Sequence, residues 1–314
     1  MWKRLVVLLC AVSLALMGCA NAQPEPKEET ASTQKEATEP KGDETKKLND
    51  YSWSELGRIS AEISDAGNED EARAIAQKYH LVNDDGTLTQ DRKQIMLKEN
   101  RLDVRLAGIF HDERSDGGGK AGLTFMTVGA IDKRSYNADE SIEGGWEKCD
   151  LRAWLQKDAL EMFEPDLVKA LVAVEKRTNN TGIITSADDI TTTSDKLWPF
   201  SVREICGDVS WDAEEYRGRW GSSFEIDQVL NAEGEQYEVF SEAGVNDHEA
   251  NAILSLEEST GAIPWWYRSV FPFEWTGYND SDATGYVCKV TKEGFPEWHD
   301  FPQVSAGVVI GFCV

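Results

Sequence analysis

Apolar and polar positions divide the chain into four stretches. Residues 1–19 are an apolar run behind a positively charged start, and residues 20–49 contain no aromatic side chain. Residues 50–101 carry apolar positions at helical spacing and then short β-like runs, which predict a small helical and hairpin segment. From residue 102 to residue 314, short helical faces and aromatic-rich β-like runs alternate with turns. This mixture predicts an α+β domain over residues 102–314.

The segment 50–101 has more detailed features. Apolar positions recur at helical spacing between residues 56 and 63 and again between residues 72 and 79, which predicts two short helices. The β-like runs at 94–98 and 102–110 are separated by a short polar turn. We therefore expect the second run to pair with the first in a hairpin.

The stretch 1–19 has the features of a secretory signal. Lys3 and Arg4 supply the positive start, and the apolar run behind them is shorter than the roughly 20 residues that cross a membrane. Its end, LMGC, resembles the lipobox of bacterial lipoproteins. That resemblance implies diacylglycerol on the Cys19 thiol, cleavage before Cys19 and acylation of the new N-terminus, an anchor with enough acyl chains to hold stably. The alternative is a secreted protein with a cysteine near its cleavage site.

Residues 20–49 predict a disordered tether. They hold Pro24, Pro26 and Pro40 and charges of both signs. Such a composition cannot bury enough apolar surface to offset the entropy of ordering the chain. A flexible chain of this length spans on the order of 30 Å. We therefore expect an extracytoplasmic globule that begins near Asp50 and is attached to the bacterial cell membrane through its lipid.

The charge balance excludes one class of partner. Lys and Arg total 32 against 57 Asp and Glu, so the formal net charge is −25. Nucleic-acid binding requires a basic surface that releases counterions from phosphates. We therefore expect no nucleic-acid partner, and an acidic chain is also unsuited to lying flat on anionic lipid.

Four cysteines remain after the signal and the lipidated Cys19. Outside the cytoplasm an even number usually means disulfides, and four cysteines allow three connectivities. We prefer the pairs Cys206–Cys313 and Cys149–Cys288, which tie the terminal strand to a short helix after Phe200. One disulfide with two free thiols is the first alternative, and a metal site is the second, although no CxxC pair is present.

The order of several motifs in the second half of the chain resembles a bacterial family of exported and surface proteins, domain of unknown function 6273. The motifs are GGW at 144–146, DLRAWL at 150–155, SDKLWPFS at 194–201, WWYRS at 265–269 and GVVIGFC at 307–313. The resemblance extends from about residue 102 to the C-terminus.

At greater distance, this family is similar to the C-type-lectin-like fold shared by sulfatase-modifying factors. The likeness rests on the WPFSVRE sequence at 198–204, a strand running into a helix, and on a terminal strand that returns to the core. It implies short helices flanking twisted antiparallel sheets. The formylglycine-generating chemistry of some relatives is not implied, because it needs two reactive cysteines close in sequence, whereas Cys288 and Cys313 are far apart.

The aromatic run at residues 265–268 is the candidate binding site. On a strand, Trp265 and Tyr267 face one side and Trp266 and Arg268 face the other. One side packs inward, so the other offers a platform on which a sugar ring stacks, and such a platform suits a weak binding groove. The alternative is core packing with Arg268 in a structural ion pair. The candidate ligand-binding residues are Trp266, Tyr267, Arg268, Trp275 and Trp298.

The segment 279–285 is a weak candidate for a calcium loop. Asp280 and Asp282 place carboxylates at alternate positions before a glycine. An EF-hand needs a bidentate Glu at its twelfth position, which here is Thr291. A polar β-turn is the alternative, and we expect no bound metal.

The motifs of common enzymes are incomplete. The GxGxxG pattern at 117–122 precedes a β-like run instead of a helix, and the HE pair at 248–249 lacks the second His because residue 252 is Ala. No GxSxG elbow is present. We therefore expect no cofactor and no catalysis, and predict a cell-surface lipoprotein whose domain binds a glycan or a surface protein. The alternatives are a structural or assembly subunit of the envelope and an extracytoplasmic hydrolase or modifying enzyme.

Overall fold

The computed structural model describes most of the chain beyond the predicted signal and tether. Among the described residues, none of the helices has both the length and the apolar character needed to cross a membrane. Cys19 lies outside the described residues. The residues that the structure describes are 46–98, 100–182, 186–210, 226–258, 261–271, 285–297 and 299–314.

The C-terminal strand joins strands from residues 93–127 in one antiparallel sheet. Its strands lie in the order β1 (Lys93–Leu97), β2 (Asn100–Ile109), β3 (Leu123–Thr127) and β13 (Gly311–Cys313). On β13, Phe312 lies opposite Phe125 of β3, and their rings stack 5.5 Å apart. The expected hairpin at residues 94–110 is confirmed as β1 and β2. The boundary expected between residues 101 and 102 falls within β2, so the two predicted segments share this sheet.

A second sheet holds the aromatic run at its centre. Its strand order is β11 (His299–Asp300), β10 (Tyr286–Val290), β9 (Trp265–Phe271), β12 (Ala306–Gly307) and β4 (Lys133–Arg134). The pairing of β12 with β9 is parallel, and the other pairings are antiparallel. Every position of β9 except the last is buried, as expected for a strand covered on both faces.

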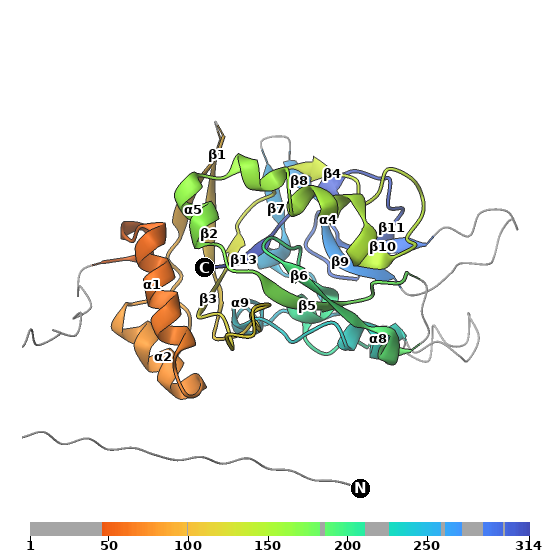
Figure 1. The fold of residues 1–314 in the computed structure, drawn as a ribbon. Helices are drawn as coiled ribbons and strands as arrows, with labels where there is room; N and C mark the ends of the chain where they lie inside the picture. The colour runs from red at the N-terminus through yellow and green to blue at the C-terminus, as the bar shows by residue number, and fades with distance from the viewer. Residues whose placement is uncertain are drawn as a thin grey trace, which may run out of the picture. The chain divides into compact units, whose positions relative to one another are not determined.

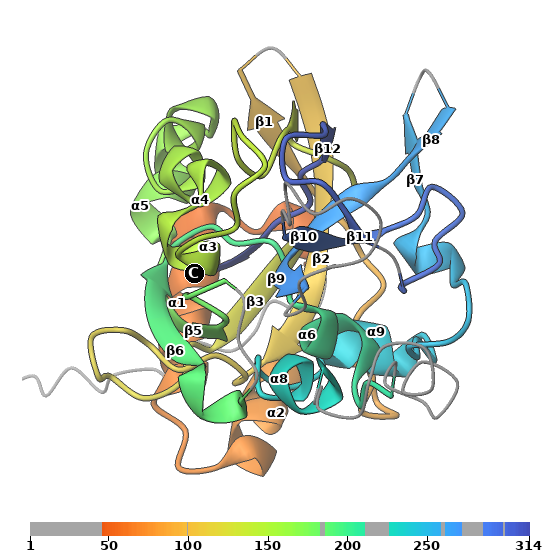
Figure 2. The same ribbon diagram turned by 90° about the vertical axis from the view of Figure 1, so that its right-hand side faces the viewer.

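Two hairpins complete the strands. β5 (Val174–Thr178) pairs with β6 (Thr191–Asp195), and β7 (Leu256–Glu258) pairs with β8 (Gly261–Ile263). In Figure 2 the β7–β8 hairpin and the β1–β2 hairpin both project from the body of the fold.

Two helices at the start of the described chain lie beside the four-stranded sheet (Figure 1). They are α1 (Trp53–Ser64) and α2 (Glu69–Lys78), as the helical spacing predicts. Ser52 caps α1 through the backbone N–H of Glu55, which satisfies one of the free donors of the first turn. The Trp53 ring packs edge-on against Phe125, 5.4 Å away, so α1 is part of the same core as the sheet.

The remaining helices are short. Figure 2 shows α6, α8 and α9 grouped together. Short helices beside mainly antiparallel sheets make the fold α+β, as predicted. The helices are α3 (Gly145–Lys148), α4 (Asp150–Leu155), α5 (Pro165–Ala170), α6 (Val202–Cys206), α8 (Ile226–Asn231) and α9 (Glu238–Glu242), with 3₁₀ turns η1 (Leu48–Asp50), η2 (Ala159–Met162), η3 (Ala187–Asp189) and η4 (Ala252–Leu254).

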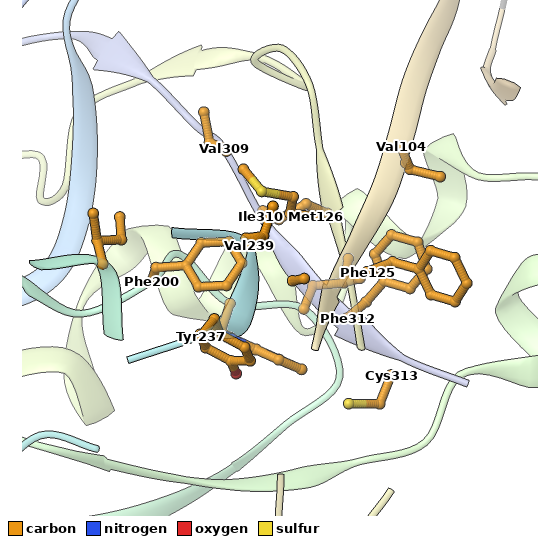
Figure 3. Close-up of a cluster of buried hydrophobic side chains, with 14 of the residues drawn as sticks. Val104, Phe125, Met126, Phe200, Tyr237, Val239, Val309, Ile310, Phe312 and Cys313 are labelled. Atoms are coloured by element: carbon orange, nitrogen blue, oxygen red, sulfur yellow. The ribbon is translucent and has the colours of Figure 1, made fainter. Parts of the chain in front are cut away.

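The core joins the four-stranded sheet to the segment around α6 and α9. Figure 3 shows Phe125 and Phe312 of the sheet in the same buried cluster as Phe200 and Tyr237. The rings of Phe200 and Tyr237 meet edge to face at 5.1 Å. This packing brings residues that are far apart in the sequence into one interior and fixes the groups described next.

Candidate functional site

The aromatic run on β9 is inside the protein. Trp266, Tyr267 and Arg268 are each 0% exposed. The Trp266 indole N–H donates to the Arg134 carbonyl at 2.8 Å, and the Tyr267 hydroxyl donates to the Pro296 carbonyl at 3.1 Å. These side chains therefore present no surface to a sugar ring, and the prediction of a platform there is wrong. The alternative, core packing with Arg268 in an ion pair, is what the structure shows.

The other predicted site residues cannot be placed. Trp275 and Trp298 lie outside the described residues, and so do Asp280 and Asp282 of the weak calcium loop. Within the described ranges, no group of three or more His, Cys, Asp or Glu side chains is arranged to hold a metal ion.

Arg268 is held by Glu204. Both nitrogens at the end of the guanidinium contact the carboxylate, with Nη2 2.9 Å from Oε1. Arg268 Nε also donates to the Thr178 hydroxyl at 2.7 Å. Glu204 reaches this position because it is the third residue of α6, where it accepts from the backbone N–H of Ser201 in a capping box. The sequence signal of a helix start therefore also fixes the partner of a buried cation.

Lys176 extends the same buried network. Its Nζ lies 2.6 Å from Asp112 Oδ1, 2.8 Å from Glu204 Oε1 and 2.8 Å from the Tyr237 hydroxyl. It also lies 4.5 Å from the centre of the Trp198 ring. Burial alone would raise the pKa of Asp112, but the charge of Lys176 holds it well below its usual value. Asp112 is therefore a permanent buried anion whose countercharge is the lysine.

Glu233 differs from these two carboxylates. It is completely buried, and burial raises its pKa to about 7 in spite of the nearby charge of Arg268. One carboxyl oxygen accepts from the Asn179 backbone N–H at 2.9 Å, and the other contacts the Ser269 hydroxyl. A group with this pKa is suited to proton transfer. Because Glu233 has no exposed surface, we assign it a structural role in this conformation.

A cavity of about 580 Å³ lies against the β2–β3 face, between that face and the segment from α9 to β7. We call it the arginine cavity, after Arg92 and Arg105. Its apolar wall includes Met126, Val239 and Val309, which come from three separate segments (Figure 3). The volume lies within the range of roughly 300–1,000 Å³ that is typical of ligand sites. The polar groups of its lining are Gln90, Arg92, Arg105, Thr127, Glu242 and Ser255.

The two arginines of this cavity are incompletely neutralised. Arg105 Nη2 donates to Gln90 Oε1 at 2.7 Å, whereas its buried Nε has no hydrogen-bond partner among the described residues. Burial lowers the pKa of Arg105, and the charge of Arg92 lowers it further, with Glu242 opposing both effects. Arg92 Nη1 is 3.7 Å from the Asp103 carboxylate. The cavity therefore combines an apolar wall with positive charge at one side.

Sequence patterns did not reveal this cavity, because its lining comes from segments between residues 90 and 309. One local signal was present. Arg105 is half-buried on β2 between Val104 and Leu106, which are both fully buried. Polar and apolar residues alternate from Arg101 to Leu106, which predicts one buried and one polar face for this strand, and the cavity lies on the side of Arg105.

A second hollow, of about 340 Å³, lies beside α4. Trp154 and Arg134 are in its lining, and the guanidinium of Arg134 lies 4.0 Å from the centre of the Trp154 ring. Because the guanidinium already occupies this face of the ring, the hollow is a poorer place for ligand stacking than its tryptophan alone would indicate.

A Ser-His-Asp group occurs near residue 210, but its geometry is not that of a catalytic triad. His248 Nε2 lies 2.9 Å from the Ser210 hydroxyl and 3.1 Å from Asp247 Oδ1. In a triad, the aspartate binds the opposite ring nitrogen and orients the imidazole toward the serine. Here both neighbours use the same nitrogen, so the histidine is not arranged to relay a proton from Ser210.

The two predicted disulfides are absent from the structure. Cys149, Cys206, Cys288 and Cys313 are buried free thiols, so neither Cys206–Cys313 nor Cys149–Cys288 is formed. The physical reason is that the fold gives the sulfurs other neighbours. Cys313 Sγ lies 3.2 Å from the Thr124 hydroxyl, Cys206 Sγ is beside the Tyr267 hydroxyl, and Cys149 Sγ is 3.3 Å from a backbone carbonyl. Burial raises the pKa of Cys149 and of Cys206 to about 12.

Comparison with known proteins gives one positive result. No curated protein and no solved structure matches the chain. The model of a domain of unknown function, DUF6273, matches residues 119–308. This range is more than half of the 314 residues, and it holds the second sheet, the buried Arg268–Glu204 pair and most of the motifs that carried the resemblance. The chain therefore belongs to the DUF6273 family.

Proposed function

We propose that the protein is a lipoprotein of the bacterial cell surface whose domain binds a ligand without catalysing a reaction. Support for its location comes from the sequence: the charged start, the short apolar run and Cys19 follow in the order of a lipoprotein signal. The polar segment 20–49 serves as the spacer between lipid and domain. In this proposal the membrane is a partner through the anchor, and the domain lies outside the cytoplasm.

The proposal includes a C-type-lectin-like architecture for the domain. Short helices beside antiparallel sheets support it, and so does the return of the terminal strand β13 to the side of β3. The Trp198 backbone forms an isolated bridge with Gly311 of β13, in place of the expected strand, and the chain enters α6 three residues after Pro199. No chemistry of the sulfatase-modifying factors is part of the proposal.

The observation that carries the binding function is the arginine cavity. It has the volume of a ligand site, a lining in which polar and apolar surface are about equal, and several polar side chains that can fix an orientation. We therefore move the proposed binding site from β9, where the aromatic side chains are buried, to this cavity. A glycan or a surface protein remains a candidate if it inserts a small group into this space.

Membrane fractionation tests the anchor. We expect wild-type protein in the membrane fraction. We expect the Cys19→Ser variant to keep its signal sequence and to carry no acyl chain that mass spectrometry detects. A Cys19→Ala substitution provides a second variant with no nucleophile at all. Processed, acylated protein from either variant would refute the lipidation of Cys19.

A cavity-blocking substitution tests the binding function. Ala252 is an exposed rim residue of the arginine cavity, so Ala252→Trp obstructs the space without overpacking the core. Ala61→Trp, at an exposed position of α1, is the matched control. Mature chains carrying Cys19→Ser are incubated with low-molecular-mass envelope extract, washed and analysed by mass spectrometry. A compound retained by wild type and by Ala61→Trp, but not by Ala252→Trp, is expected; equal retention by all three would count against the site.

A further inference from the structure

The charge of the arginine cavity is opposite to that of the chain. The whole sequence has a net charge of −25, yet the charged groups in the lining are Arg92, Arg105 and Glu242, a local excess of one positive charge. Glu242 is partly committed elsewhere, because it accepts from the Leu88 backbone N–H at 2.9 Å. Burial also raises the pKa of Glu242, which reduces its tendency to stay ionised. The lining therefore has two guanidinium groups against one carboxylate, in a chain that is acidic as a whole.

Arg105 has donor capacity that the protein leaves unused. Its Nη2 bonds to a neutral amide oxygen of Gln90, and its Nε is buried without an acceptor in the described part of the chain. A guanidinium matches carboxylate and phosphate groups because its parallel N–H donors bind two oxygens at once. Arg92 adds a second cation, whose 3.7 Å contact with Asp103 joins two half-exposed side chains and is weak. Because Arg105 Nε has practically no accessible surface, an anionic group of the ligand would bind the terminal nitrogens of the two guanidinium groups.

The rest of the cavity suits a hydrocarbon body. Val128, Ala243, Ala252 and Ile253 supply apolar surface that is not fully buried, and the space of about 580 Å³ exceeds what an inorganic anion would fill. Trp265 also borders the cavity but is only 1% exposed, so it provides no open ring face for a sugar. The lining therefore favours a molecule with one anionic end and one apolar end over a neutral sugar.

We propose that the arginine cavity binds small amphipathic organic anions, with the carboxylate or phosphate on Arg105 and Arg92 and the apolar part against Val128 and Ile253. This inference deepens the proposed function and rests on it. The ligand class is fixed by the guanidinium pair at one side of the space and by the aliphatic wall at the other.

Three probes with the same hydrocarbon chain separate charge from apolar burial: decanoate, decanol and decylamine. Isothermal titration calorimetry with the mature Cys19→Ser chain is expected to show decanoate binding at least about tenfold tighter than the other two, the effect of one charge-assisted contact. Decanoate affinity is expected to fall as NaCl is raised. Inorganic phosphate, which lacks the apolar part, is expected to bind more weakly than decanoate.

Variants assign the effect to the cavity. Arg105→Gln is expected to weaken decanoate binding about tenfold and to leave decanol binding unchanged. Arg92→Gln, at a more exposed position, serves as a second variant if Arg105→Gln fails to fold. Arg101→Gln lies on the same strand, is exposed and does not line the cavity, so it is expected to bind decanoate as wild type does.

The outcomes distinguish this inference from the proposed function. If decanol and decanoate bind equally and Ala252→Trp blocks both, the cavity is a binding site and its preference for anions is refuted. If decanoate binding is unaffected by Ala252→Trp and by both arginine substitutions, the anion lies elsewhere and the inference is wrong. If no probe binds while an envelope compound is retained through the cavity, the ligand class is again overturned, although the binding function stands.

Discussion

The guanidinium of Arg268 and the carboxylate of Glu204 face each other through paired contacts inside the protein. Nη2 and Oε1 are 2.9 Å apart, and the two side chains are 0% and 3% exposed. Glu204 is also 2.8 Å from Lys176, which binds Asp112 in turn. A buried ion pair gains little net stability over an apolar pair, but the loss of one partner leaves an uncompensated charge in the interior.

Arg268→Met is therefore expected to destabilise the protein strongly. Removing one partner of a buried pair typically costs about 3–5 kcal/mol in the free energy of unfolding. Lys176 remains beside Glu204, so the lower part of this range is expected. Urea unfolding followed by circular dichroism measures the change. Arg203→Met is the control, because Arg203 pairs with the 96% exposed Asp208 and its loss should cost under about 1 kcal/mol; equal losses would refute the role of the buried pair.

The raised pKa of Glu233 predicts that the free energy of unfolding decreases as the pH rises toward neutrality. Its pKa is about 7 in the folded protein, against 4.5 for a free glutamate. Below pH 4.5 both states carry the proton; between pH 4.5 and 7 the unfolded chain releases it and the folded protein keeps it. Unfolding is favoured progressively across this window, by about 3 kcal/mol in total at 1.4 kcal/mol per pKa unit. Burial of the carboxyl is the cause.

Glu233→Gln is expected to remove this dependence. Urea midpoints of wild type and variant, measured between pH 4.5 and 7.5, should diverge with rising pH, the variant becoming relatively more stable. Glu235→Gln, at an exposed neighbouring position, should run parallel to wild type. Parallel curves for Glu233→Gln as well would show that this carboxyl does not titrate in the window. Asp112 and Glu204 act in the opposite direction at lower pH, since their lowered pKa values cause stability to be lost as pH falls below about 4.

The buried thiols predict a protein that is inert to thiol reagents while folded. Burial raises the pKa of Cys149 and Cys206 to about 12, and the thiolate is the reactive form. In the mature Cys19→Ser chain, Ellman's reagent at pH 8 is expected to find almost no thiol in buffer and all four in urea without reductant. A count of two or none in urea would show that disulfides form, contrary to the structure.

Local signals in the sequence predicted local structure well. The helical spacing around Leu56 and Ile59 predicts α1, and the short helix expected after Phe200 is present as α6. These elements depend on neighbours within one or two turns, so the pattern of residues is enough to define them.

The exposed aromatic platform predicted on β9 is wrong because the burial of this strand does not depend on local sequence. An arginine in a strand usually marks a face that is open to solvent. Arg268 is buried instead, because the carboxylate of Glu204, from a distant part of the chain, neutralises it. β9 is the central strand of its sheet, and the burial of successive residues from Trp265 to Val270 shows that both of its faces are covered. The cavity needs Arg105, Val239 and Val309 at once, and no window of sequence contains all three. Topology decided these features.

The strand order also predicts which fragment of the chain can fold by itself. The family match, 119–308, includes β3 but omits β1 and β2 on one side of it and β13 on the other. Phe125 would lose both Phe312 and Trp53, its ring partners.

A fragment limited to residues 119–308 is therefore expected not to fold, because β3 keeps no neighbour in its sheet and its apolar face is exposed to water. Residues 42–314 form one compact unit, and a fragment with these ends is expected to unfold cooperatively on heating. Near-ultraviolet circular dichroism, which reports on packed aromatic side chains, compares the two. A native-like near-ultraviolet spectrum from 119–308 would show that the second sheet and its buried Arg268–Glu204 pair are sufficient for folding and that the N-terminal helices are an independent addition.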